Sequence, residues 1–170
     1  MDLDRLANIA EIVGVLLVVG GFGFAIVQLA AIRRQRREIA AIELLKSFES
    51  PEFARAIRLL LTLPENATAE QLRSAGGDVE DAAMQVSLTL EGVAIMVHRR
   101  IVDIDMVWEL MGGLVLAVWA RIGLLAEAIR KDHKRDKFCE WLQWLAARLM
   151  DVEKERGSQP AFARYRDWKP

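Results

Sequence analysis

Residues 12 to 32 read IVGVLLVVGGFGFAIVQLAAI, the longest uncharged run in the chain, with Gln28 as its only strongly polar side chain. A helix rises about 1.5 Å per residue, so this run would be about 30 Å long, which matches the hydrocarbon core of a bilayer. The alternatives are a buried core helix and a cleaved signal peptide. Signal peptides begin with basic residues, whereas this start is acidic. The run therefore predicts one N-terminal transmembrane helix.

The charges on the two sides of this run predict its direction in the membrane. A basic cluster follows the run, formed by Arg33, Arg34, Arg36 and Arg37. Positive charge beside a span stays in the cytoplasm and contacts anionic lipid headgroups. We therefore expect a single-pass protein of the inner (cytoplasmic) membrane. Residues 1–11 would lie outside, and everything after residue 32 would lie in the cytoplasm.

Small residues recur along the predicted span at a spacing of four. Ala10 is followed by Gly14, and Gly21 is followed by Ala25. Small residues at this spacing let two membrane helices approach closely, which indicates a helix-pairing face and a homo-oligomer. The alternative is the ordinary tolerance of membrane helices for glycine.

Beyond the span, the pattern indicates a juxtamembrane helix over 33–49, a helical bundle over 50–156 and a tail over 157–170. Ser50 and Pro51 are typical of a helix start, and Thr68 with Gln71 matches a capping box. Asp78 and Asp103 are the predicted N-caps of two longer helices, which end near Arg100 and Arg130. The last helix is expected from about Arg135 to Gly157.

Apolar residues within the bundle recur at three- and four-residue steps, as in Val79, Ala83, Val86, Leu90, Val93 and Val97. No stretch alternates with strand period, so the fold class is all-α, with the helices packed as an antiparallel bundle. The uncharged run 110–120 is short for a second span, although that alternative stays open. Its Gly112-Gly113 pair predicts close contact with a neighbouring helix.

The composition argues against several functions. The chain is 53% apolar with a formal net charge of −1, which is untypical of a nucleic-acid binder. Its two histidines, His98 and His133, belong to no metal-binding spacing, and we expect no metal or other cofactor. Cys139 stands among apolar residues and is interpreted as a packed thiol. No catalytic constellation is visible, so the sequence does not indicate an enzyme.

Glu91 interrupts the apolar stretch between Val86 and Val97. A carboxylate is costly there unless it is paired or reaches water. Arg121 also interrupts an apolar helix, so we expect the two side chains to form a buried polar pair that fixes the register of the helices. The alternative is a polar pocket between helices that binds a small ligand.

The stretch from Leu88 to Leu149 resembles the core of an uncharacterised bacterial family of membrane-anchored helical proteins, a domain of unknown function. The residues that carry the likeness are Glu91, Arg99, Arg100, Asp103, Asp105, Gly112, Gly113, Trp119, Phe138 and Trp141. The resemblance implies an N-terminal anchor followed by a helical domain. It implies no activity.

These features lead to a first hypothesis of a membrane-tethered interaction or scaffold protein. Its partners would be the lipid bilayer, a second copy of the chain or an unknown protein, and not nucleic acid. The alternative is a membrane-anchored sensor or effector that binds a small ligand between its helices.

Overall fold

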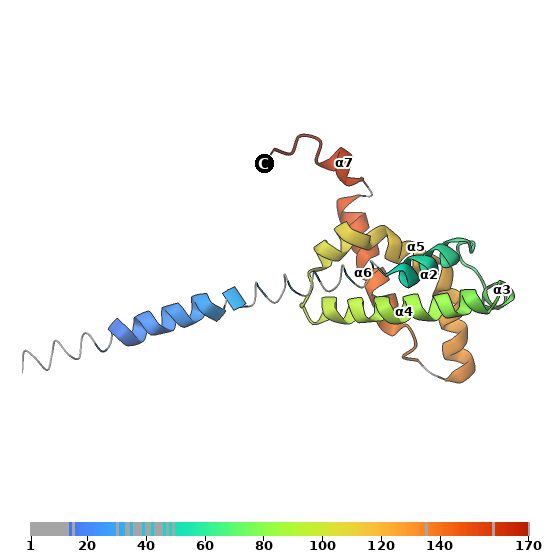
Figure 1. Cartoon of the computed structure of the whole chain (residues 1–170), viewed down its shortest axis with the longest axis horizontal. Coiled ribbons are helices and arrows are strands. Elements are labelled where there is room, and N and C mark those ends of the chain that lie inside the picture. The colour runs from blue at the N-terminus through green and yellow to red at the C-terminus, as the bar shows by residue number, and fades with distance from the viewer. Residues whose placement is uncertain are drawn as a thin grey trace, which may run out of the picture. The chain divides into compact units, whose positions relative to one another are not determined.

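The computed structural model describes residues 14, 16–29, 31, 32, 35, 39, 42, 46, 48, 50–134, 136–157 and 159–169. Every regular element in these residues is a helix, which confirms the all-α class. The chain divides into two compact units, Met1–Ala41 and Ile42–Pro170 (Figure 1).

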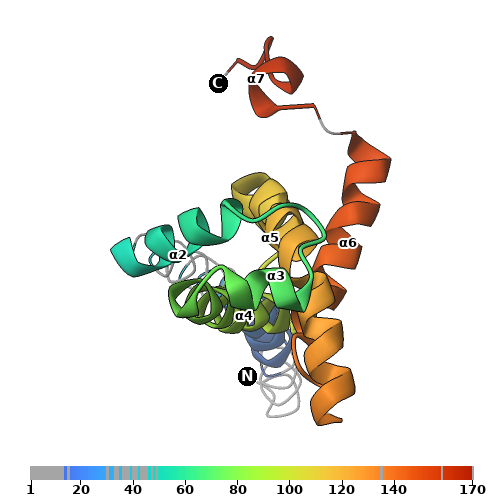
Figure 2. The same ribbon diagram turned by 90° about the vertical axis from the view of Figure 1, so that its right-hand side faces the viewer.

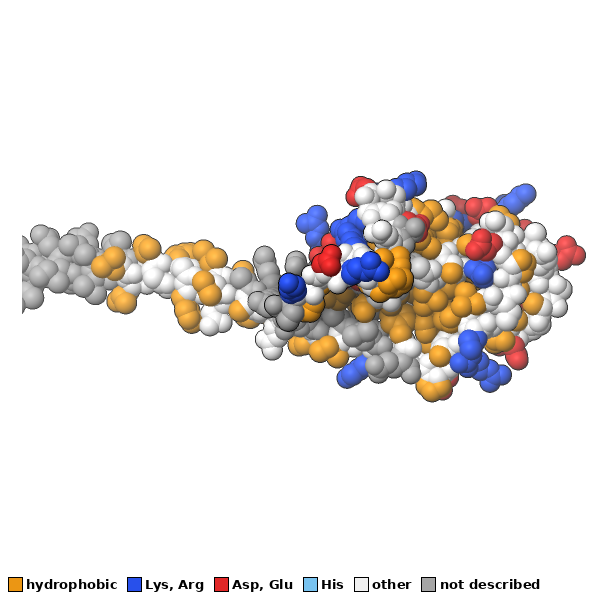
Figure 3. Space-filling model, turned by 90° about the horizontal axis from the view of Figure 1, so that it is seen from above, with side chains coloured by type: hydrophobic (Ala, Val, Ile, Leu, Met, Phe, Trp, Pro, Cys, Tyr) orange, Lys and Arg blue, Asp and Glu red, His pale blue; other side chains and the backbone are white. Residues whose placement is uncertain are grey.

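The first unit contains the apolar helix Leu16–Leu29. Its large hydrophobic side chains are between 51% and 70% exposed. Figure 3 shows this stretch in orange and white, without a charged side chain. Gly14, Gly21 and Ala25 of the predicted pairing face are exposed, whereas Ala10 and the basic cluster Arg33, Arg34, Arg36 and Arg37 lie outside the described residues.

The second unit contains helices α2 (Pro51–Leu61), α3 (Ala69–Ser74), α4 (Gly77–His98), α5 (Ile104–His133), α6 (Glu140–Arg156) and α7 (Ala161–Arg164). Helices α5 and α6 pack together as an antiparallel hairpin. Their opposite directions are shown by the ion pair between Asp105, at the start of α5, and Arg156, at the end of α6, at 2.7 Å. Helix α2 runs back along α4, and α4 also packs on α6 (Figures 1 and 2).

Local sequence signals explain several helix starts. The Ser50 hydroxyl accepts a hydrogen bond from the Phe53 amide, and Thr68 and Gln71 form the predicted capping box. Asp103 caps α5 by accepting from the Asp105 amide. The prediction for α4 was wrong, because its N-cap is Gly76 at φ 110° and Asp78 lies inside the first turn. Glycine suits that position since it has no Cβ to clash.

The predicted seam of α4 forms much of the core of this unit. Its members Val79, Ala83, Val86, Leu90, Val93 and Val97 are all buried, as predicted. From α5 the buried residues are Val107, Met111, Gly112, Val115, Val118, Ile122 and Ala126. They repeat at three- and four-residue steps, so α5 turns one face into the core.

Among the described residues, α5 is the one helix that is long and apolar enough to cross a membrane by length and composition, and 33% of its most apolar window is buried. The prediction that the glycine pair on α5 marks close contact with a neighbouring helix is wrong for Gly113, which is exposed. A Cβ at Gly112 would collide with the ring of Trp108 on the same helix, whereas Gly113 faces open space.

Candidate functional site at the junction of helices α4, α5 and α6

Glu91 reaches across from α4 to the beginning of α6. Its Oε1 accepts a hydrogen bond from the Leu142 amide at 2.8 Å. Leu142 is in the first turn of α6, whose own N-cap residue, Cys139, offers no side-chain bond. The free amides of a helix start carry partial positive charge, which a carboxylate satisfies. Glu91 therefore caps a helix that is distant in sequence.

Cys139, the N-cap residue of α6, is 4% exposed. Burial raises the pKa of the Cys139 thiol, and the nearby Glu91 charge raises it further. The hydrogen bond from the Ser87 side chain and the charge of Arg130 act in the opposite direction. A thiol with a raised pKa holds little thiolate at neutral pH, so Cys139 is a poor nucleophile. The interpretation as a packed thiol is confirmed.

Arg130 forms hydrogen bonds that stabilise the turn between α5 and α6. Its Nε donates to the Phe138 carbonyl at 2.7 Å, and its Nη1 donates to Gln143 Oε1 at 2.6 Å. Its Nη2 is buried, and no residue in the described part of the chain accepts a hydrogen bond from it. Together these contacts fix where α6 begins, which explains why the helix starts at residue 140 and not near 135.

A pocket of about 310 Å³ opens beside this junction. It is lined by Leu72, Arg73, Glu80, Ala83, Met84, Ser87, Leu125, Ile129, His133 and Phe138. This volume is at the lower end of the range of small-molecule sites, and the mixture of apolar walls with a few polar groups is typical of them. Glu91 is not among the lining residues. In the part of the chain that the structure describes, no cluster of three metal-ligating side chains exists.

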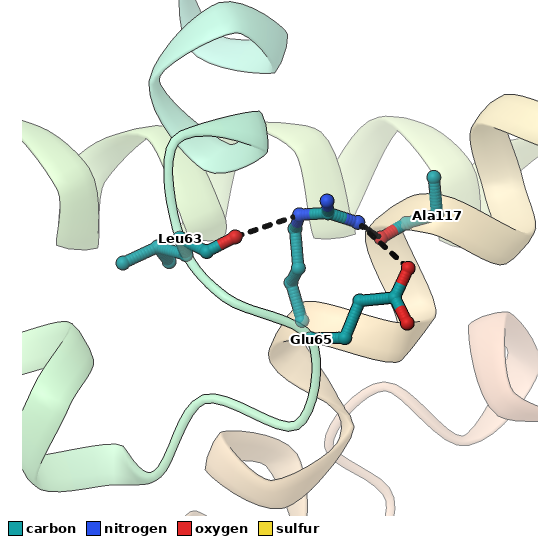
Figure 4. A network of polar contacts seen from close by, with 4 residues as sticks. Leu63, Glu65 and Ala117 are labelled. Atoms are coloured by element: carbon teal, nitrogen blue, oxygen red, sulfur yellow. Dashed lines mark hydrogen bonds and ion pairs between the residues drawn. The ribbon is translucent and has the colours of Figure 1, made fainter.

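Arg121 lies in a separate polar network (Figure 4). Its Nε donates to the Leu63 carbonyl at 3.0 Å, and its Nη1 donates to the Ala117 carbonyl at 2.8 Å. Nη1 also lies 3.9 Å from the Glu65 carboxylate. These contacts hold the loop between α2 and α3 against α5. The predicted pairing of Arg121 with Glu91 was therefore wrong, because each side chain has other partners.

Sequence reasoning missed an aromatic cluster at the end of α4. The His98 ring lies 4.6 Å from the Trp141 ring and 5.6 Å from the Trp144 ring, measured between centroids. The two tryptophans on α6 also meet edge to face at 6.1 Å. The spacing of Trp141 and Trp144 places them on one helix face, but no sequence signal assigned His98 to them.

Comparison with known proteins gives one finding. A protein-family model described as "Domain of unknown function (DUF4760)" matches residues 15–149. No curated protein and no solved structure matches the chain.

Proposed function

This chain belongs to that family of unknown function, and we propose that it is a membrane-tethered helical interaction protein. In this proposal, residues 12–32 cross the inner membrane once, with residues 1–11 outside and the helical unit in the cytoplasm. The basic cluster Arg33, Arg34, Arg36 and Arg37 lies at the cytoplasmic headgroups. The helical unit presents its surface to a protein partner.

The observation that supports the tether best is the exposure of the helix Leu16–Leu29. Nine large hydrophobic side chains of this helix are at least 51% exposed. Exposed apolar surface is unfavourable in water by about 25 cal/mol per Å², and a lipid environment removes that cost. Helix α5 is also apolar, but it has its own packing against α6 and α2. The proposal therefore assigns the anchor to the first unit and leaves α5 in the second.

The direction of the chain is tested by labelling single cysteines in intact cells. Cys139 is too buried to report its side of the membrane. The starting variant is therefore Cys139→Ala, to which Gln159→Cys at an exposed position or Asp2→Cys is added. A membrane-impermeant maleimide should label Asp2→Cys at once and Gln159→Cys only after the cells are permeabilised. Labelling of Gln159→Cys in intact cells would refute the proposed direction.

The pocket beside α4 supports a second candidate function, the binding of a small apolar ligand. Apolar side chains from α3, α4 and α5 form most of its wall, with Arg73 and Ser87 available to a polar group. In this proposal, a ligand would be held between the helices and would stabilise the α4–α5 contact.

The anionic apolar dye 1-anilinonaphthalene-8-sulfonate is a suitable probe of this pocket. We expect saturable fluorescence with the full chain above that of the detergent alone, and a weaker signal for Leu125→Trp, which places a larger ring at a half-buried position in the pocket wall. Val152→Phe, at a half-buried position outside the pocket, is the control. Equal binding by all three chains would exclude the pocket as the site.

A further inference from the structure

Helix α4 carries a second seam opposite its buried face, and the first two positions of this seam also line a groove beside α2. The positions of the seam are Asp81, Gln85, Leu88, Gly92, Ile95 and Arg99. They are separated alternately by four and three residues, which is the spacing of a coiled-coil seam. All six are exposed, with Leu88 at 66% and Ile95 at 40%. We propose that this outer seam pairs with the outer seam of a second copy of the chain, in the antiparallel direction.

Two of the three kinds of pair in the outer seam are complementary in reverse order, Asp81 with Arg99 and Leu88 with Gly92, and Gln85 faces Ile95. When two copies of α4 lie antiparallel about Leu90, Leu88 of each copy faces Gly92 of the other. No atom lies within 4 Å of a Cβ built on Gly92, so the leucine has room there. Met84 is 43% exposed beside the seam and adds apolar surface to the contact. The arrangement has two-fold symmetry, as most homodimers do.

The charges at the ends of the outer seam select this direction. In the antiparallel pair, Asp81 of each copy lies opposite Arg99 of the other, which gives two attractive contacts. In a parallel pair, Asp81 would face Asp81 and Arg99 would face Arg99, and both contacts would be repulsive. Complementary charges at the edge of an interface fix its orientation and register more than its affinity.

The inference rests on the proposed function in one respect, since it identifies the partner of the interaction surface as the chain itself. A single helix pair is a small interface. Anchoring both copies in one membrane raises their effective concentration and favours such a contact. The dimer and the anchor are measured separately, so that either proposal can fail alone.

Charge exchange at the two ends of the seam tests the pairing. The chains are compared in mild detergent by sedimentation, and circular dichroism verifies their folding. We expect Asp81→Arg alone and Arg99→Asp alone to weaken dimerisation about fivefold to tenfold, because each turns two attractions into repulsions. The double variant should dimerise as the unchanged chain does. In a parallel pair each residue would face its own copy, so none of the three variants would change the sign of a contact. Weakening by the single variants, with recovery in the double variant, therefore distinguishes the antiparallel pair from a parallel one.

The apolar centre is tested with Leu88→Lys, which should weaken dimerisation at least tenfold. Leu124→Lys, at a 41% exposed leucine on α5, is the matched control and should leave the dimer intact. Flotation with lipid vesicles reports the anchor in the same samples. A chain that floats but is monomeric would overturn this inference and leave the tether standing. A dimer that ignores all the α4 changes but is lost in Gly21→Leu would also overturn it.

Discussion

Gly112 and Gly113 are adjacent in α5 and have opposite surroundings. The ring of Trp108 covers Gly112, whereas Gly113 has open space around it. We expect Gly112→Ala to lower the free energy of unfolding by about 1–3 kcal/mol, because the methyl group overpacks the ring. Gly113→Ala should raise it by about 0.5–1 kcal/mol, because alanine favours the helix.

Urea unfolding of the two variants, followed by circular dichroism at 222 nm, measures both effects. Each variant is the control for the other, since both substitutions add one methyl group to the same turn of α5. Equal effects of the same sign would contradict the role of Trp108.

The thiol of Cys139 gives a pH dependence to stability. Its pKa in the folded chain is raised from the ordinary value of 9.0, mainly by burial. Below that value the thiol is neutral in both states, and stability is unaffected. As the pH rises through it, the unfolded chain loses the proton more readily, so folding becomes less favourable. Stability measured from pH 8 to pH 10 should therefore fall more steeply for the unchanged chain than for Cys139→Ala. Parallel curves would refute this, since lysine titration is common to both chains.

Single residues also mark where sequence reasoning succeeds and where it stops. Glu91 was identified from the sequence because a charge among apolar residues must have a partner. Its partner, the Leu142 amide, is 51 residues away. Every residue other than proline has a backbone amide, so the sequence does not indicate which one binds Glu91. Arg121 was likewise correctly identified as unusual, but its acceptors are the carbonyls of Leu63 and Ala117.

At the scale of the helices, the start of α6 depends on a group that α6 does not contain. We expect Glu91→Ala to destabilise the chain by about 1–2 kcal/mol, because it leaves the Leu142 amide without its acceptor. Glu91→Gln keeps an acceptor oxygen, so its loss should be smaller. Glu127→Ala, at an exposed position on α5, is the control and should change stability by less than about 0.5 kcal/mol.

Hydrogen exchange of the first turn of α6 identifies the cause of this effect. The Leu142 amide should exchange faster in Glu91→Ala, while amides in the middle of α5 keep their protection. A uniform increase across the helical unit would mean that Glu91 acts by general packing and not as a cap.

Three helix starts followed the sequence because their capping groups are local. Ser50, Thr68 and Asp103 each bind an amide two or three residues ahead, and all three were predicted. The start of α6 was misplaced because Lys134 and Cys139 adopt left-handed backbone angles, at φ 50° and 53°. Residues of these types seldom adopt such angles, so the break has no signature in the sequence. Here the contacts of Arg130 and Glu91 determine the break.

For the whole molecule, hydropathy does not by itself separate the proposed anchor from a core helix. The helix Leu16–Leu29 and α5 are both apolar, and they differ in how much of their surface is buried. The described side chains of the first helix are exposed on all sides, while α5 turns a regular stripe into the helical unit. The distinction therefore comes from packing, and charges introduced into each helix can test it.

We expect the double variant Val18→Arg with Phe22→Arg to release the chain from lipid vesicles. An arginine near the centre of a span costs about 2.5–3.5 kcal/mol, so two of them remove most of the insertion energy of one helix. The matched variant carries Leu110→Arg with Leu124→Arg, which places two arginines at exposed leucines of α5. It should float with the vesicles as the unchanged chain does, because those side chains would face water. If the α5 variant were released and the first variant still floated, α5 would be the anchor, and the proposed topology would have to be abandoned.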